Sequence, residues 1–151
     1  MIKIICLGKI KESYISDAIK EYQKRISRYH QLEIIELDDV GLDDKSVVLK
    51  KEQEKILKVL NPKEYIITLE IEGKEISSVE FAEKLNSTFN QNSNITFIIG
   101  GSFGLSDEIK KLSNFKLSFS KMTFPHQLFR VILLEQIYRA FKIINNEEYH
   151  K

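Results

Sequence analysis

Residues 116–141 read KLSFSKMTFPHQLFRVILLEQIYRAF, and they combine a short strand, a polar turn and a long apolar helix. The strand pattern covers Lys116–Phe119, and Pro125 then opens the helix, because proline suits a first helical turn in which its missing N–H removes no hydrogen bond. The helix is predicted to run to about Ile144, before the stop signal Asn145-Asn146. Its apolar residues surround the helix axis, which indicates burial on several sides. We therefore expect a second subunit to cover part of this helix.

Four ionisable side chains lie on this apolar helix, namely His126, Arg130, Glu135 and Arg139. Such groups are rarely buried without a partner or a task. His126 and Arg130 share one face of the helix, and Glu135 and Arg139 share another, where glutamate four residues before arginine favours an ion pair. The helix is thus the predicted interface, with Leu133 and Ile137 in it, and the predicted site. An ion pair that only fixes helix packing and a capping role for His126 are the alternatives.

Strand and helix patterns alternate along the whole chain. The strand candidates are Ile2–Leu7, Leu32–Leu37, Tyr65–Glu70, Ile95–Ile99 and Lys116–Phe119. The helix candidates are Ser13–Arg28, Lys45–Leu60, Ser77–Phe89, Ser106–Leu112 and the closing helix. This order predicts an α/β fold with a parallel sheet of about five strands and helices on both faces. Residues 1–151 are expected to form one domain.

Composition limits the class of protein. The chain is 42% hydrophobic and 30% charged, as soluble globular proteins are, and no apolar run reaches the roughly 18 residues that span a bilayer. The only cysteine, Cys6, excludes an internal disulfide and favours a cytoplasmic location. Three scattered histidines predict no metal site. Both ends are basic and the middle is acidic, which hints at a polyanion-binding face or at uneven surface charge without function.

A glycine-rich turn follows a buried strand in residues 94–106, NITFIIGGSFGLS. The glycine spacing fits neither a dinucleotide-binding turn nor a P-loop. Ligands gather at the carboxyl edge of parallel sheets, where glycine lets the backbone approach them closely. We expect the strand ends after Leu69, Ile99 and Phe119 to converge on one crevice that holds a small cofactor. A purely structural tight turn is the alternative.

The chain ends in Tyr149-His150-Lys151, which joins a stacking ring, a titratable imidazole and a cation. This set is suited to gripping an extruded nucleotide, and it forms a short lid. A frayed chain end without function is the alternative.

Three segments together carry a resemblance to a known family: FIIGGSFGLS at 97–106, LSFSKMTFPHQLFRVILLEQIYRAF at 117–141, and the terminal YHK. They resemble the RlmH (YbeA-type) family of SPOUT methyltransferases over essentially the whole chain. The resemblance implies a homodimer with a deep C-terminal trefoil knot. It also implies an S-adenosylmethionine-dependent enzyme that methylates N3 of a pseudouridine in the helix 69 loop of 23S ribosomal RNA, in the large ribosomal subunit or the assembled ribosome.

The same resemblance assigns residues to the two halves of the site. The implied cofactor-binding residues are Leu69, Gly100, Gly101, Gly104, Phe119, Ser120, Lys121, Met122, Thr123 and Phe124. The implied residues of the substrate pocket are His126, Arg130, Glu135, Arg139, Tyr149, His150 and Lys151.

Methylation of a ring nitrogen needs removal of an N–H proton and in-line placement of the methyl donor. His126, Glu135 and His150 are candidate bases, and Arg130, Arg139 and Lys151 are candidate phosphate ligands. Two other functions are compatible with the residues. One is a non-catalytic RNA- or ribosome-binding factor on an α/β scaffold, and the other is a regulatory domain that binds a small molecule.

Overall fold

A computed structural model describes residues 1–151, and a five-stranded parallel sheet forms its centre. The elements in chain order are β1 (Ile2–Leu7), α1 (Ser13–Ile26), β2 (Leu32–Leu37), α2 (Lys45–Val59), β3 (Tyr65–Glu75), α3 (Ser78–Phe89), β4 (Ile95–Ile99), α4 (Asp107–Leu112), β5 (Phe115–Ser118) and α5 (His126–Ile144). The strand order is β2-β1-β4-β3-β5, and every neighbouring pair is parallel. The predicted fold class is confirmed.

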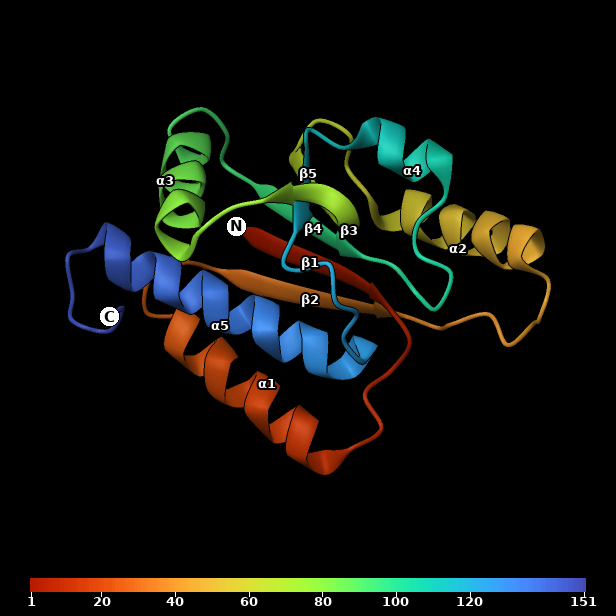
Figure 1. Ribbon diagram of the computed structural model, residues 1–151, viewed down its shortest axis with the longest axis horizontal. Helices are drawn as coiled ribbons and strands as arrows, with labels where there is room; N and C mark the ends of the chain where they lie inside the picture. The colour runs from red at the N-terminus through yellow and green to blue at the C-terminus, as the bar shows by residue number, and fades with distance from the viewer.

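Helices cover both faces of the sheet, with α1, α3 and α5 on one face and α2 and α4 on the other (Figure 1). The strands supply both layers because successive side chains point to opposite faces. In β1, Ile4 and Cys6 pack in the core beneath α1, α3 and α5, whereas Ile5 and Leu7 pack beneath α2 and α4. Strands buried on both faces are nearly continuous apolar runs, as parallel sheets require.

Strand β3 is longer than its apolar pattern predicts. We expected it to stop at Glu70, but it continues to Glu75 after an irregularity. Both Leu69 and Lys74 align with Leu117 of β5, so residues 70–73 bulge out of the ladder between them. Gly73 allows β3 to rejoin β5 after the bulge, because a Cβ at this position would lie 2.7 Å from the Lys116 carbonyl oxygen. The glycine marks a close backbone approach, and the bulged residues become available to a site.

The helix boundaries follow the sequence signals within two residues. Ser77 caps α3 through the expected capping box, in which its hydroxyl accepts from the Glu80 N–H and the Glu80 carboxylate accepts from the Ser77 N–H. Pro125 is the N-cap of α5 instead of its first helical residue. At the other end Asn146 adopts a left-handed conformation with φ of 54°, which ends the helix after Ile144.

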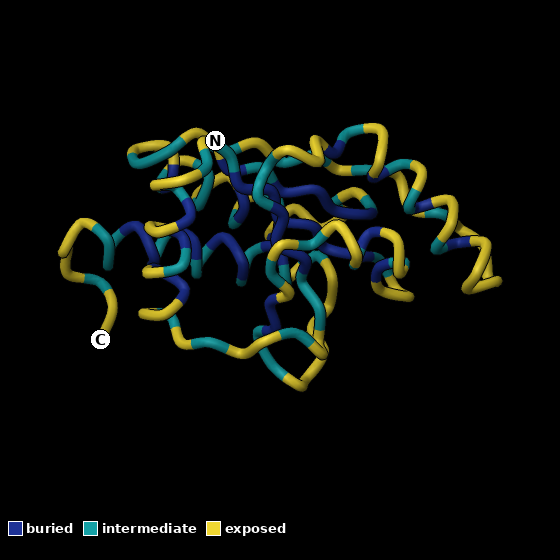
Figure 2. Tube along the Cα trace, turned by 90° about the horizontal axis from the view of Figure 1, so that it is seen from above, coloured by how far each residue is buried: buried dark blue, intermediate teal, exposed yellow.

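Helix α5 is buried mostly by its own protomer, which corrects the expected role of two residues. Leu133 and Ile137 are 0% exposed and belong to the main core with α1, α3 and the sheet. The apolar residues around the axis are therefore explained by three neighbours within one chain. Figure 2 shows buried tube along this helix and exposed tube at the chain end. Leu128, near the start of α5, is still 41% exposed.

None of the helices combines the length and the apolar character needed to cross a membrane. The trefoil knot implied by the resemblance stays a prediction.

Candidate functional site

The main cleft lies at the carboxyl ends of β3, β4 and β5, where ligands gather in parallel sheets. Its volume is about 640 Å³, which is within the usual range for a small-molecule site. The bulge of β3, the glycine turn after β4 and the segment after β5 all line it. The expected convergence of three strand ends on one crevice is confirmed. Nine of the ten expected cofactor-binding residues line this cleft: Leu69, Gly100, Gly101, Gly104, Phe119, Ser120, Met122, Thr123 and Phe124. Lys121 is exposed and is not among the lining residues.

The glycine turn after β4 is built so tightly that side chains are excluded from it. A Cβ on Gly100 would lie 2.6 Å from the carbonyl carbon and oxygen of Gly104. The Gly104 N–H donates to the Gly101 carbonyl at 3.0 Å, and Gly104 has a φ of +78°. This turn therefore offers bare backbone to the cleft, because only glycine fits both the close approach and the left-handed conformation.

The opposite wall is the segment between β5 and α5, which short polar contacts hold in place. The Ser118 hydroxyl donates to the Ser120 carbonyl at 3.2 Å, and the Met122 N–H donates to the Ser120 hydroxyl at 3.0 Å. Phe124 stacks on Phe129 of α5 with ring centroids 5.7 Å apart. The cleft thus combines apolar walls with the backbone of the glycine turn, which no side chain covers at Gly100, Gly101 and Gly104. These features suit an adenosine carrying an amino-acid tail, so the residues present fit S-adenosylmethionine.

A second cleft of about 340 Å³ adjoins the first. Gly101, Ser102, Phe103 and His126 line both clefts. The second cleft is bounded further by the end of β1, the loop after β2 and helix α2. Two ligands bound in the two clefts would therefore meet across one short segment of chain.

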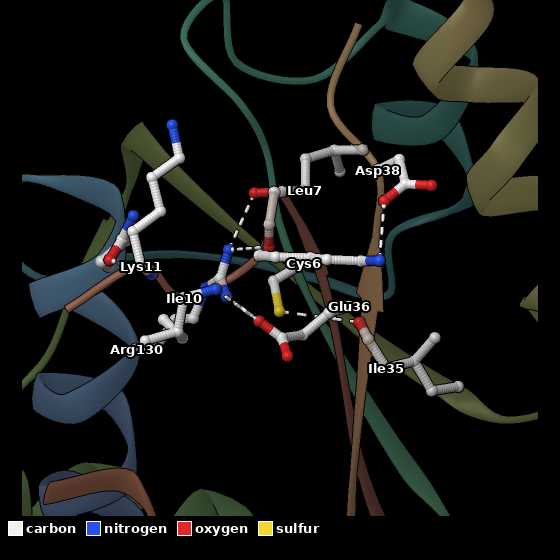
Figure 3. Close-up of polar contacts among 11 residues, drawn as sticks. Cys6, Leu7, Ile10, Lys11, Ile35, Glu36, Asp38 and Arg130 are labelled. Atoms are coloured by element: carbon white, nitrogen blue, oxygen red, sulfur yellow. Dashed lines mark hydrogen bonds and ion pairs between the residues drawn. The ribbon is translucent and has the colours of Figure 1, made fainter. Parts of the chain in front are cut away.

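Arg130 borders the second cleft, but its guanidinium is buried and already bonded (Figure 3). Nη2 donates to the carbonyl oxygens of Leu7 at 2.8 Å and Gly8 at 2.6 Å, and Nη1 donates to Glu36 Oε2 at 2.9 Å. The side chain joins α5 to the ends of β1 and β2. Since Arg130 is only 2% exposed, this geometry favours an anchoring role over the expected contact with an RNA phosphate.

His126 is the expected substrate residue that lines both clefts. Partial desolvation of its ring is the larger cause that lowers its pKa, and the nearby positive charge of Arg130 lowers it further. The imidazole is therefore neutral at pH 7 and can accept a proton.

Glu135 and Arg139 form the expected ion pair, but they lie away from both clefts. Arg139 donates to Glu135 Oε1 from Nη2 at 2.6 Å and from Nε at 2.9 Å. The hydroxyls of Tyr22 and Tyr149 donate to Glu135 Oε2 at 2.7 and 2.9 Å. With all these donors the Glu135 carboxylate is a poor candidate base in this arrangement.

The same cluster holds the chain end. The Tyr149 ring lies beneath the Arg139 guanidinium, with its centroid 4.7 Å from Arg139 Cζ. His150 Nδ1 is 3.2 Å from Arg139 Nη1. Lys151 is the exposed last residue. In Figure 1 the C-terminus lies at the opposite end of α5 from the carboxyl ends of the strands. One protomer therefore does not bring the terminal tripeptide to its own clefts.

Cys6 is a buried strand residue whose thiol donates to the Ile35 carbonyl at 3.5 Å (Figure 3). Burial is the main cause that raises its pKa to about 11. The thiol stays protonated at pH 7, so it does not act as a nucleophile.

Two residues of interest were not predicted from the sequence. Tyr22 reaches Glu135 from α1, 113 residues away in the chain, and no local pattern marks that contact. Glu52 of α2 lines the second cleft and is buried. The sequence does mark Glu52: it is the one acid on the helix face formed by Val48, Glu52 and Ile56, and a helical plot would have revealed it. No group of three or more His, Cys, Asp or Glu side chains is placed to hold a metal ion.

Comparison with known proteins identifies the class to which this parallel sheet and its cleft belong. The family model described as "Predicted SPOUT methyltransferase" matches residues 1–150. The structure titled "The structure of a probable methylase family protein from Haemophilus influenzae Rd KW20" has a TM-score of 0.61 at 16% identity, over 99% of this chain and 70% of that one. At that identity the likeness shows the fold alone.

Full-length relatives narrow the class. A protein of Methanococcus maripaludis (strain C5) is 60% identical over 99% of both chains. A Clostridium botulinum (strain Alaska E43) protein named ribosomal RNA large subunit methyltransferase H is 53% identical, also over 99% of both chains. The chain therefore belongs to the SPOUT methyltransferase family, in the group named ribosomal RNA large subunit methyltransferase H.

Proposed function

We propose that this protein methylates large-subunit ribosomal RNA with S-adenosylmethionine, and that the acceptor is N3 of a pseudouridine in the helix 69 loop. The pair of adjoining clefts carries the proposal. The first, walled by the glycine turn and residues 119–124, suits the cofactor, and the second can present a base beside it. The names of the full-length relatives support large-subunit ribosomal RNA as the substrate. The reaction would take place in the cytoplasm, where ribosomes are.

Bound S-adenosylmethionine supplies a methyl group on a sulfonium centre. The protein must hold the acceptor nitrogen in line with that methyl and take up the N3 proton. His126 is suited to the proton transfer because it lines both clefts and its pKa is lowered. The rate should therefore rise with pH as the imidazole loses its proton, and His126→Asn should lower kcat and remove this dependence.

A homodimer is part of the proposal, because one protomer separates its own site residues. Helix α5 has 19 residues, which corresponds to a length of about 28 Å, and the terminal tripeptide lies at its far end. A second copy would bring its own Tyr149, His150 and Lys151 to these clefts. Exposed apolar side chains near the cleft end of α5 offer a surface for that copy: Met122, Phe124 and Leu128.

The experiment combines cofactor binding with product analysis. Calorimetry should detect S-adenosylmethionine binding to the wild-type protein, and mass spectrometry should find one methyl group on N3 of the target pseudouridine in ribosomes treated with it. Gly100→Ala should weaken cofactor binding at least tenfold, because its Cβ would stand 2.6 Å from the Gly104 backbone. Gly41→Ala is the matched control, since a Cβ there meets nothing within 4 Å.

Two results would count against the proposal. No heat of binding at millimolar cofactor would exclude a methyltransferase. RNA binding that survives Gly100→Ala, with no methylated product from the wild type, would favour a non-catalytic ribosome-binding factor.

A further inference from the structure

Glu52 is a buried acid that has no ion-pair partner in the protein. It is 4% exposed and lies between Val48 and Ile56 on the buried face of α2. No Lys, Arg or His nitrogen is within ion-pair distance of it, and Oε1 has no hydrogen-bond partner. Transferring a polar group from water to an apolar environment without a compensating hydrogen bond costs about 2–7 kcal/mol of free energy. Such groups are rare in folded proteins and call for an explanation.

The position of Glu52 points to a ligand. Its side chain lines the second cleft, and its carboxylate lies against Gly101, where a Cβ would be 3.0 Å from Oε2. Gly101 belongs to the segment that separates the two clefts. The carboxylate is therefore close to the place where a ligand of the second cleft meets a ligand of the first.

The lining of the second cleft favours a neutral polar ring. Its charged side chains are balanced in sign and are Lys9, Lys11, Arg130, Asp39, Asp43 and Glu52. Arg130 already donates three hydrogen bonds inside the protein, from Nη1 to Glu36 and from Nη2 to the Leu7 and Gly8 carbonyls. Phe103 is 38% exposed at the shared wall and offers a face on which a base can stack. The volume of about 340 Å³ is near the lower end for small-molecule sites.

We propose that the second cleft receives the target base and that the Glu52 carboxylate accepts the N1–H of pseudouridine. This inference rests on the proposed function and assigns its specificity. Uridine is bonded to ribose through N1 and has no hydrogen there, whereas pseudouridine is bonded through carbon and keeps an N1–H. N1 and N3 flank the same carbonyl group, so N1 can face Glu52 while N3 faces the shared wall.

The electrostatics agree with this assignment. Desolvation is the main cause that raises the pKa of Glu52; a backbone hydrogen bond from Val40 and the positive charge of Lys55 oppose the rise, and the negative charge of Asp39 adds to it. A bound N–H donor relieves that penalty. Uridine leaves the acceptor unpaired and desolvated, and sites built to bond a substrate N–H can reject an analogue without it by up to about 10⁴-fold.

The test compares Glu52→Leu with Glu54→Leu, a control with the same change on an exposed position of the same helix. The substrates are ribosomes that carry either pseudouridine or uridine at the target position. For Glu52→Leu, kcat/KM on pseudouridine should fall by about 10- to 100-fold, as loss of one charged hydrogen bond implies, and should change little on uridine. Glu54→Leu should match the wild type on both. Glu52→Gln keeps an acceptor oxygen and should retain most of the preference.

Stability provides a second readout. Because Glu52 is unpaired in the folded protein, replacing it with leucine should leave the melting temperature equal or higher. Loss of selectivity without loss of stability would distinguish recognition from a structural role. An unchanged preference for pseudouridine, or equal losses on both substrates, would overturn the assignment of Glu52. Wild-type protein that methylates neither ribosome would refute the proposed function itself, and the assignment with it.

Discussion

Replacing Arg130 with methionine should destabilise the protein without touching RNA directly. The guanidinium makes three hydrogen bonds, to the carbonyl oxygens of Leu7 and Gly8 and to the Glu36 carboxylate. Methionine fills a similar volume but donates nothing. The carbonyl groups at the end of β1 would lose their charged donor while they remain covered.

The expected magnitude follows from the exposure of the partners. Removing one partner of a buried ion pair usually costs about 3–5 kcal/mol. The Glu36 side chain is 37% exposed, so water can hydrate its freed carboxylate, and we expect a loss near the lower figure, about 3 kcal/mol. Domains of this kind have about 5–15 kcal/mol of stability, so the variant should still fold. With a urea m-value of about 2 kcal/mol/M, the unfolding midpoint should fall by about 1.5 M.

Urea unfolding followed by circular dichroism measures this loss, with Arg139→Met as the matched control. Arg139 is on the same helix, but its side chain is 24% exposed and it donates to no backbone carbonyl, whereas Arg130 donates to two. Its replacement should lower stability by no more than about 1 kcal/mol. Equal midpoints for the two variants would refute the anchoring role. Unchanged stability of Arg130→Met together with weaker, less salt-dependent RNA binding would instead restore the phosphate role.

Three further predictions follow from the burial and pairing of particular residues. Leu133→Ala should lower the free energy of unfolding by about 2–5 kcal/mol, because this fully buried side chain leaves a cavity; Leu133→Asp should unfold the protein, and a folded monomer seen by sedimentation would contradict this. Removal of Tyr149–Lys151 should keep the fold and the cofactor affinity, since Glu135 retains Tyr22 and Arg139 as donors, but should lower turnover in single-turnover assays; full activity would exclude a lid. The raised pKa of Glu52 means that the folded state disfavours its charged form, so the stability advantage of Glu52→Gln should be absent below about pH 4, where the carboxyl is protonated in both states, and should grow as the pH rises above that. Melting curves with no pH-dependent difference would contradict it.

Local signals in the sequence were sufficient for the elements and their order. The alternation of strand and helix patterns, the capping box at Ser77 and the stop at Asn145-Asn146 all depend on residues within one or two turns of each other. Gly100 and Gly101 marked the cleft because glycine after a buried strand is a local feature with a known place in parallel sheets. The irregular path of β3 escaped prediction, since Gly73 terminates a strand pattern and equally permits a bulge.

The chain by itself determined which residues carry charge on an apolar helix, but only the tertiary structure decided what each of them does. Arg130 meets Glu36 and Leu7 across 94 and 123 residues of sequence, and Glu135 meets Tyr22 across 113. The periodicity of apolar residues shows which face of a single helix or strand is buried. Contacts between residues far apart in the chain depend instead on the order of the strands in the sheet and on how the helices pack against it. For the same reason the buried carboxylate of Glu52 was visible as an interruption of an apolar stripe, while its place beside the glycine turn followed only from the packing of α2 against the sheet.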